Sequence, residues 1–185
     1  MAIFATSDTH LCHTLPDIFL PRGFQTADEH TDGIIKLWND TVTDEDDIYH
    51  LGDMFMSDQI RGLEAVRELR GRIHLYRGNH DTDKKMEALM TLPNIVECRT
   101  DLYSNIIKFK KHEYYLSHWP TMVGNRRESV PRIICLHGHT HSPDKFQFLE
   151  FGCYNVSMDA QNCRPVRIDN IREEFKAEIQ RRLNT

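Results

Sequence analysis

The stretch LHGHTH, residues 136–141, places His137, His139 and His141 on alternate positions, with Gly138 and Thr140 between them. In a regular strand all three side chains would point to one face, because side chains repeat with a period of two. Gly138 relaxes that rule, since glycine adopts backbone angles that other residues avoid. Three imidazoles this close together suit neither a packed strand nor a solvated loop. The pattern therefore raises the question of whether the rings meet a metal, a phosphate or each other.

The composition is that of a globular protein. The chain has 185 residues, of which 39% are hydrophobic and 28% charged, and its formal net charge is −5. Proteins that grip long nucleic acid usually carry a basic excess, so long nucleic acid is not favoured as a partner. No run approaches about 18 apolar residues, and the first residues do not resemble a signal peptide, so we expect no membrane contact. Five cysteines without a C-x-x-C pair indicate reduced thiols and a cytoplasmic location.

Hydrophobic periodicity predicts alternating strands and helices in the first half of the chain. Strands are expected at residues 2–7, 47–51 and 72–77, and helices at 26–40, 57–69 and 82–90. Thr26 and Glu29 match a capping box, and Ser57 is the expected cap of the second helix. The inner face of that second helix is expected to carry Ile60, Leu63, Val66 and Leu69.

After Pro93 the pattern is mostly that of strands. Residues 106–109 and 113–118 are expected to form a hairpin, and residues 132–141, 145–151, 154–159 and 165–168 further short strands. A last helix is expected from Asp169 to about Leu183, with Ile171, Phe175 and Ile179 inward. Residues 1–185 are thus predicted to form one domain. Its predicted fold class is α/β, a four-layer α/β/β/α sandwich of two mixed β-sheets flanked by helices.

Polar clusters follow the predicted strands. In chain order the sequence supplies Asp8, His10, Asp53, Asn79, His118, His139 and His141 at or just after strand ends. Ligands of open α/β sheets collect at the carboxyl ends of the strands. Imidazole and carboxylate groups suit Mn²⁺, Fe²⁺ or Zn²⁺. A single such cluster would be weak evidence, but their order and placement together predict a metal site.

With these polar clusters the chain resembles the calcineurin-like metallophosphoesterases. The sequence pattern of that family has five blocks: D-x-H, then G-D, then G-N-H-D or G-N-H-E, then a lone His, and last G-H-x-H. The corresponding blocks here are SDTH, LGDM, RGNHD, LSHWP and HGHTH, in this order across residues 7–141. It looks especially like the compact bacterial and phage members of that family. Arg22-Gly23-Phe24, Trp38-Asn39 and the segment NVSMD at 155–159 also fit that subgroup.

The resemblance implies a centre of two divalent metal ions, with Mn²⁺ favoured and Fe, Zn, Ni or Mg as alternatives. It implies that the first ion would be held by Asp8, His10 and His141, and the second by Asn79, His118 and His139. Asp53 would bridge the two ions. His137 is left over, and we expect it to be a buried partner of the ligands rather than a ligand.

Two such ions would polarise a phosphoester and activate a water molecule as the attacking hydroxide. His80, in the GNHD block but outside the ligand set, would protonate the leaving oxygen, and Asp81 would orient His80. His13 and Arg22 are candidate contacts to the substrate phosphate, since Arg binds phosphate with two parallel hydrogen bonds. For His13 a role in a surface loop is an equal alternative.

The sequence therefore predicts a metal-dependent phosphoesterase with a small phosphoester as its partner. We expect a phosphodiesterase acting on small nucleotide-like or cyclic diesters, because no cap segment interrupts the motif blocks and the site should be open. The alternatives are a phosphomonoesterase and a nuclease acting on DNA or RNA ends. A scaffold of the same fold without catalytic activity is disfavoured by the intact ligand set. The sequence predicts no oligomeric state.

Overall fold

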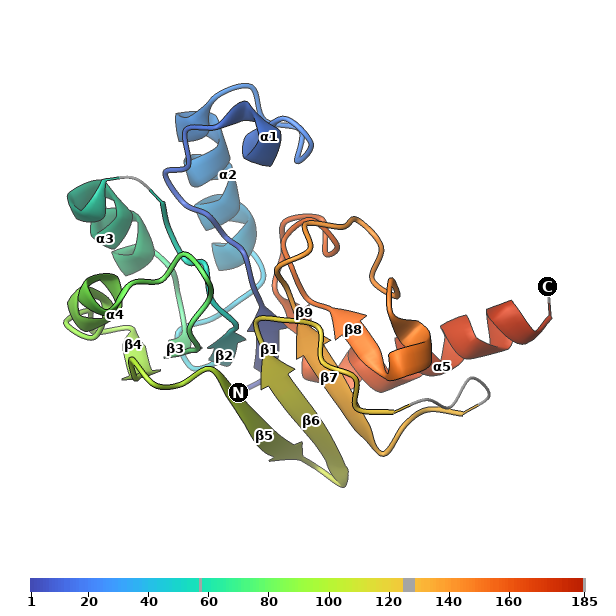
Figure 1. The fold of residues 1–185 in the computed structure, drawn as a ribbon. Helices are drawn as coiled ribbons and strands as arrows, with labels where there is room; N and C mark the ends of the chain where they lie inside the picture. The colour runs from blue at the N-terminus through green and yellow to red at the C-terminus, as the bar shows by residue number, and fades with distance from the viewer. Residues whose placement is uncertain (57, 125–128, 185) are drawn as a thin grey trace.

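Five strands form the first sheet, in the order β4-β3-β2-β1-β9 (Figure 1). A computed structural model describes residues 1–56, 58–124 and 129–184 of the chain. The strands are β1 (Ile3–Thr6), β2 (Asp47–His50), β3 (Arg72–Leu75), β4 (Ile95–Cys98) and β9 (Val166–Arg167). The first four run parallel and β9 pairs antiparallel with β1, so the sheet is mixed. The predicted strands at 2–7, 47–51 and 72–77 are confirmed, whereas β4 was not predicted.

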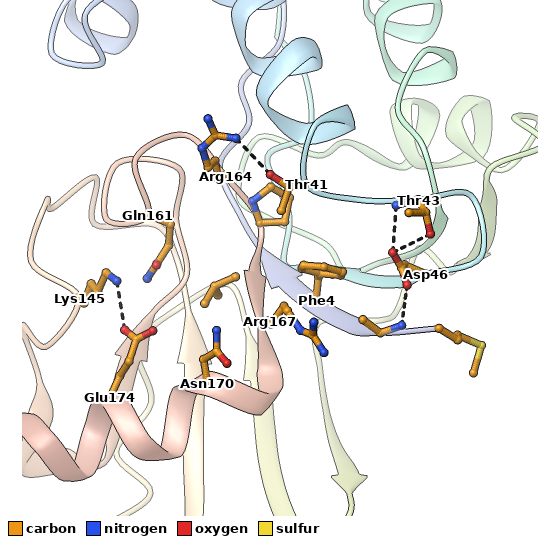
Figure 2. Close-up of a pocket in the computed structure, with 14 residues that line it drawn as sticks. Phe4, Thr41, Thr43, Asp46, Lys145, Gln161, Arg164, Arg167, Asn170 and Glu174 are labelled. Atoms are coloured by element: carbon orange, nitrogen blue, oxygen red, sulfur yellow. Dashed lines mark hydrogen bonds and ion pairs between the residues drawn. The ribbon is translucent and has the colours of Figure 1, made fainter.

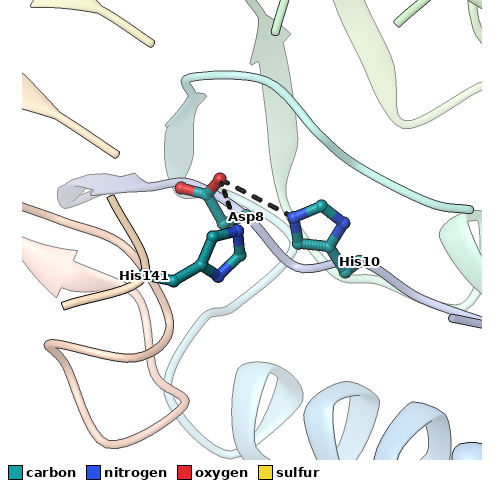
Figure 3. Close-up of side chains that lie close together, drawn as sticks. All are labelled: Asp8, His10 and His141. Carbon is teal, nitrogen blue, oxygen red and sulfur yellow. Dashed lines mark ion pairs between the residues drawn. The ribbon is translucent and has the colours of Figure 1, made fainter. Parts of the chain in front are cut away.

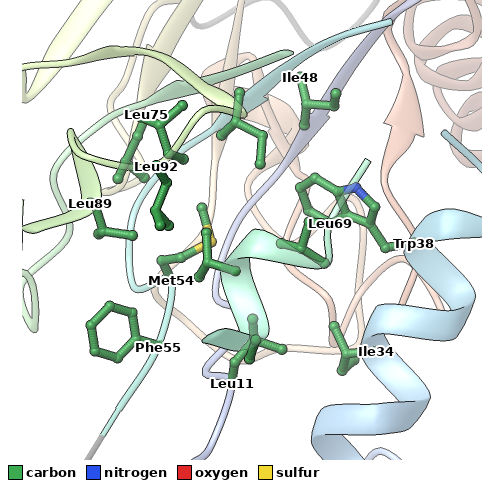
Figure 4. Close-up of a cluster of buried hydrophobic side chains, with 14 of the residues drawn as sticks. Leu11, Ile34, Trp38, Ile48, Met54, Phe55, Leu69, Leu75, Leu89 and Leu92 are labelled. Carbon is green, nitrogen blue, oxygen red and sulfur yellow. The ribbon is translucent and has the colours of Figure 1, made fainter. Parts of the chain in front are cut away.

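Helices pack against this sheet and close the larger hydrophobic core (Figure 4). They are α2 (Ala27–Asn39), α3 (Gln59–Arg67) and α4 (Asp83–Leu89), while the short α1 (Pro16–Phe19) lies beside α2. Ile34 and Trp38 of α2 are fully buried there. The Thr26 hydroxyl accepts the backbone N–H of Glu29, which confirms the predicted cap.

The start and inner face of α3 differ from the prediction. The cap is Asp58, whose carboxylate accepts the N–H groups of Ile60 and Arg61, and the predicted cap Ser57 lies outside the described residues. Ile60 is 71% exposed, so its placement on the inner face was wrong. Gly62 instead faces the core, where a β-carbon would lie 2.1 Å from the Phe55 ring. The helix approaches the core through this small residue, which turns Ile60 outward.

The second sheet has the order β5-β6-β7-β8 and is also mixed. Its strands are β5 (Ser104–Phe109), β6 (His112–Ser117), β7 (Ile133–His137) and β8 (Cys153–Asn155). β5 and β6 form the predicted antiparallel hairpin, and β6, β7 and β8 run parallel. The predicted strand at 145–151 is wrong: turns and the 3₁₀ helix η1 (Leu149–Phe151) occupy it. Phe146 and Leu149, which face the core, are three residues apart, and that spacing fits a turn rather than a strand.

A second apolar cluster joins the two sheets, and the last helix, α5 (Ile168–Leu183), contributes to it. Ile171, Phe175 and Ile179 of α5 are buried as predicted. Asp169 lies in the first turn of the helix but is not its cap, which is Arg167. The predicted fold, two mixed sheets flanked by helices, is confirmed. None of the described helices is long and apolar enough to span a membrane.

A groove of about 690 Å³ lies near the amino ends of β1 and β2 (Figure 2). Its polar groups are largely engaged with one another: Lys145 pairs with Glu174, and Arg164 donates to the Thr41 hydroxyl. None of the candidate ligands lines this groove. The candidate site therefore lies elsewhere, at the opposite ends of the strands.

Candidate metal centre

The predicted ligands come together at the carboxyl ends of strands from both sheets. Asp8 and His10 follow β1, Asp53 follows β2 and Asn79 follows β3 in the first sheet. From the second sheet, His118 follows β6, and the His139–His141 segment follows β7. The candidate ligands thus lie at the strand ends where the sequence pattern predicts them.

The first group of donor atoms comes from three residues, Asp8, His10 and His141 (Figure 3). Asp8 Oδ1 lies 3.7 Å from His10 Nε2 and 3.8 Å from His141 Nε2. The other oxygen of Asp8, Oδ2, accepts the backbone N–H of His139 at 2.9 Å. One carboxylate oxygen is therefore fixed by the chain and the other faces two imidazole nitrogens.

The second group consists of Asn79, His118 and His139. Asn79 Oδ1 lies 2.8 Å from both His118 Nε2 and His139 Nδ1, and these two nitrogens are 3.2 Å apart. The other ring nitrogen of His118, Nδ1, donates to the Leu51 carbonyl at 2.9 Å. That bond leaves the Nε2 lone pair of a neutral His118 directed toward Asn79.

Asp53 lies between the two groups. Its Oδ2 is 3.8 Å from His10 Nε2 in the first group and 3.5 Å from His118 Nε2 in the second. Its Oδ1 accepts the backbone N–H of His80 at 2.9 Å. Asp53 is 1% exposed, so this arrangement is shielded from water. A single oxygen atom thus faces donor atoms of both groups.

These residues fit metal ions by two tests. Asp8 Oδ1 and both ring nitrogens of His10 are buried without a hydrogen-bond partner among the described residues, which is rare for polar atoms in a folded protein. Two ligands about 2.1 Å from one ion, at tetrahedral to octahedral angles, lie about 3.0–3.4 Å apart. The observed separations of 2.8–3.8 Å bracket that range. The unpaired atoms are therefore placed and spaced as ligands would be.

Backbone strain is concentrated in the same residues. Five candidate ligands have left-handed backbone angles, at φ values of 58° for Asp8, 46° for His10, 59° for Asp53, 69° for His139 and 48° for His141. Such a conformation costs a residue other than glycine on the order of 1–3 kcal/mol. The turns that aim these side chains are stabilised by the surrounding fold and not by local preference.

Gly138 is required by the close approach of two segments. A β-carbon on Gly138 would lie 2.1 Å from Asp8 Oδ2 and 2.2 Å from the hydroxyl of Ser7. No side chain fits at that distance, and the neighbouring His139 N–H could not then reach Asp8. The glycine in HGHTH therefore allows the β7 loop to contact the β1 loop and complete the first group.

Burial sets the protonation of two of the candidate imidazole ligands. It lowers the pKa of His10 and of His139 below the usual histidine value. Both rings are therefore neutral at pH 7, which is the form that binds a metal ion. Burial raises the pKa of Asp53, whereas for Asp8 the neighbouring His10, His118 and His141 rings outweigh burial and lower the pKa.

His80 lies at the edge of this site. Its ring centre is 5.9 Å from that of His10, its side chain is exposed, and its ring has no hydrogen bond to any other described residue. Its backbone is fixed, because the N–H donates to Asp53 Oδ1 and the carbonyl accepts from Lys85 Nζ at 2.7 Å. The ring is therefore free to contact a bound molecule.

Asp81 does not orient His80, contrary to the prediction. Asp81 Oδ2 accepts the backbone N–H groups of Asp53 at 2.7 Å and Gly78 at 3.0 Å, and its Oδ1 has no hydrogen-bond partner in the described part of the chain. The side chain is 2% exposed and has no hydrogen bond to the His80 ring. Asp81 therefore positions the loop that carries Asp53.

Arg22 is not available to a substrate, which corrects the expectation of a phosphate contact. Its side chain is 1% exposed, and all its N–H groups are directed at protein acceptors. His13, by contrast, lies beside the site, with its ring centre 5.4 Å from that of His10. Its Nδ1 accepts the N–H of Leu15, and burial lowers its pKa to about 4, so Nε2 carries the proton of a neutral ring.

His137 is the last residue of β7, and no hydrogen bond joins its ring to a described residue of either donor group. Its ring is fully buried, Nδ1 donates to the Gly138 carbonyl at 2.9 Å, and Nε2 has no hydrogen-bond partner among residues 1–56, 58–124 and 129–184. We expect His137→Ala to lower metal affinity or turnover by about 10–100-fold, the range for residues that support ligands. Equilibrium dialysis and steady-state kinetics would measure this loss. A loss as complete as in His139→Ala would instead make His137 a ligand.

Comparison with known proteins agrees with this geometry. Residues 1–151 match the model of the calcineurin-like phosphoesterase superfamily domain, so the chain belongs to that superfamily. Its members are typically metal-dependent phosphoesterases with a dinuclear metal centre. The predicted family is thereby confirmed.

The chain is also similar to individual proteins. It is 29% identical to an uncharacterised protein of Methanocaldococcus jannaschii, covering 91% of this chain and 88% of that protein. It is 29% identical to the gene 66 protein of Mycobacterium phage L5, covering 75% of this chain and 76% of that protein. A protein of unknown function from Aquifex aeolicus has a similar crystal structure, with a TM-score of 0.68 and 25% identity, covering 93% of this chain and 98% of that one.

Proposed function

We propose that this protein is a phosphodiesterase that uses two divalent metal ions, preferably Mn²⁺, to hydrolyse small nucleotide-like or cyclic phosphodiesters. Asp8, His10 and His141 would hold the first ion, Asn79, His118 and His139 the second, and Asp53 would be shared. The observation that carries the proposal is the position of Asp53 Oδ2, within 3.8 Å of a nitrogen of the first group and 3.5 Å of one of the second.

The bound ions would supply positive charge to the phosphoryl oxygens and an activated water as nucleophile. The remaining roles fall to side chains of this chain. His80 would give a proton to the leaving oxygen, because its ring borders the site and has no other described partner. His13, neutral and with its proton on Nε2, would donate a hydrogen bond to the substrate phosphate.

A diester is favoured by the exposure of one side of the site. Asn79, His80 and His139 are exposed, so the site is open to solvent beside the second group. A phosphodiester, which carries an organic group on each of two phosphoryl oxygens, can therefore fit there. The alkoxide that leaves an alkyl phosphoester needs a proton, and His80 offers one. The net charge of −5 argues against long nucleic acid as substrate. Small phosphoesters are therefore the proposed partners.

The test begins with protein freed of metal by chelation and then reloaded with Mn²⁺. We expect two ions per chain by metal analysis and hydrolysis of bis(p-nitrophenyl) phosphate and cyclic nucleotides, with slower hydrolysis of p-nitrophenyl phosphate and of single-stranded DNA. The chelated protein serves as the inactive control. Binding of no ion would favour a scaffold, and faster hydrolysis of monoesters would make the protein a phosphomonoesterase.

A further inference from the structure

Arg22 and Asp159 form a buried ion pair that contacts two residues of the first donor group, Asp8 and His141. Asp159 accepts from Arg22 twice, with Nε to Oδ1 at 3.0 Å and Nη2 to Oδ2 at 2.8 Å. The side chains are 1% and 10% exposed. Paired hydrogen bonds of this kind fix the geometry of both partners, and solvent screens them little at this depth.

The remaining N–H groups of Arg22 hold the β1 loop. Nη2 donates to the carbonyl of Asp8 at 2.9 Å and Nη1 to that of Thr9 at 3.2 Å, while Nη1 also faces His30 Nε2 at 3.1 Å. These carbonyls lie within the turn where Asp8 and His10 have left-handed angles. Arg22 therefore stabilises the strained backbone that aims two candidate ligands.

Asp159 in turn sets the orientation of His141. Its Oδ2 lies 3.0 Å from His141 Nδ1. A carboxylate paired with arginine is ionised and can only accept, so His141 Nδ1 must carry a proton. In the neutral ring the lone pair is then on Nε2, the atom that lies 3.8 Å from Asp8 Oδ1.

We propose that Arg22 and Asp159 are positioning residues for the first metal ion, which select the Nδ1-protonated form of His141 and tie it to the Asp8–His10 turn. This inference rests on the proposed function, because it takes His141 as a ligand. Among the described residues the pair has no hydrogen bond to the side chains of the second group, whose His118 is oriented by the Leu51 carbonyl. Loss of the pair should therefore weaken one ion and spare the other.

Asp159→Asn tests the proposal, because asparagine keeps the shape but removes the charge that holds both Arg22 and His141. We expect the affinity for one ion to fall by about 10–100-fold, with the other unchanged, in equilibrium dialysis of the chelated protein against Mn²⁺. Arg22→Lys keeps the positive charge but cannot form two parallel hydrogen bonds to Asp159, so it should lower the affinity for the same ion. Asp169→Asn is the matched control, since Asp169 pairs with Lys110 and Arg167 away from the site.

The outcomes separate this inference from the proposed function. Wild-type protein that binds fewer than two ions would overturn the proposed function. Wild-type protein that binds two, together with an Asp159→Asn variant of unchanged affinity for both, would overturn only the role of the pair. Equal weakening of both ions would also overturn it.

The tautomer of His141 can also be measured in wild-type protein, which does not depend on the folding of an Asp159 variant. In metal-free wild-type protein at mildly alkaline pH, nitrogen NMR of the histidine rings should show His141 protonated on Nδ1, with its signal assigned by its absence in His141→Gln. In Asp159→Asn the Nε2-protonated form should increase. Wild-type His141 protonated on Nε2 would overturn the proposal.

Discussion

Asp53→Asn is expected to abolish hydrolysis and to lower the occupancy of both metal ions. Asp53 Oδ2 faces nitrogens of both donor groups, so its charge attracts both ions at once. Asparagine has nearly the same shape, but it is neutral. Metal analysis after loading with Mn²⁺, together with turnover on bis(p-nitrophenyl) phosphate, would measure the two losses. Asp8→Asn is the matched comparison and should empty mainly one site.

The stability of the metal-free variant distinguishes lost binding from misfolding. Burial raises the pKa of Asp53, so above its unfolded pKa the ionised carboxylate destabilises the metal-free fold. Neutral asparagine removes that penalty, and the metal-free variant should melt at the wild-type temperature or above. Wild-type protein should also gain about 2.7 kcal/mol of stability from an ion at 100 times its dissociation constant, and the variant should not. Two ions per chain with near-normal turnover would contradict the assignment of Asp53.

The sequence was sufficient to predict where the candidate site lies, because the site follows from strand ends. Each motif block directly follows a run of apolar residues, and parallel strands bring their carboxyl ends to one edge. Burial also followed periodicity where the pattern was long, as for Ile171, Phe175 and Ile179 of α5. Short patterns were less informative: residues 145–151 alternate like a strand but form turns and η1.

The direction of individual side chains could not be predicted in this way. Arg22 was expected to contact substrate because arginine suits phosphate, but its donors are used by Asp159, a residue 137 positions away. In the sequence, Asp159 stands out only as part of the NVSMD segment. Its hydrogen bond to His141 depends on the contact between the loop after β8 and the loop after β7. Asp81 adjoins His80 in sequence, yet its carboxylate turns to the backbone of Asp53 and Gly78. Such pairings depend on tertiary structure and carry no local signal.

His80→Ala is expected to keep both metal ions and to slow the hydrolysis of an alkyl diester by about 10²–10⁴-fold, the range for a lost general acid. The metals should remain because His80 contacts Asp53 only through its backbone N–H, which alanine retains. Its carbonyl likewise keeps the bond from Lys85. Metal analysis and turnover on the alkyl diester would measure the two expectations. His112→Ala, which changes a histidine at the exposed start of β6, is the matched control.

The leaving group separates proton donation from charge stabilisation. A nitrophenolate departs without a proton, so the loss on bis(p-nitrophenyl) phosphate should be much smaller than the loss on the alkyl diester, because an acid helps in proportion to the basicity of the oxygen it protonates. Equal losses on both substrates would indicate that the His80 ring stabilises charge on the phosphoryl oxygens. Loss of a metal ion in the same variant would contradict both roles and place His80 among the ligands. The His80 ring has its centre 5.9 Å from that of His10 and no hydrogen bond to any other described residue. This favours the first outcome, because the ring is free to reach a leaving oxygen.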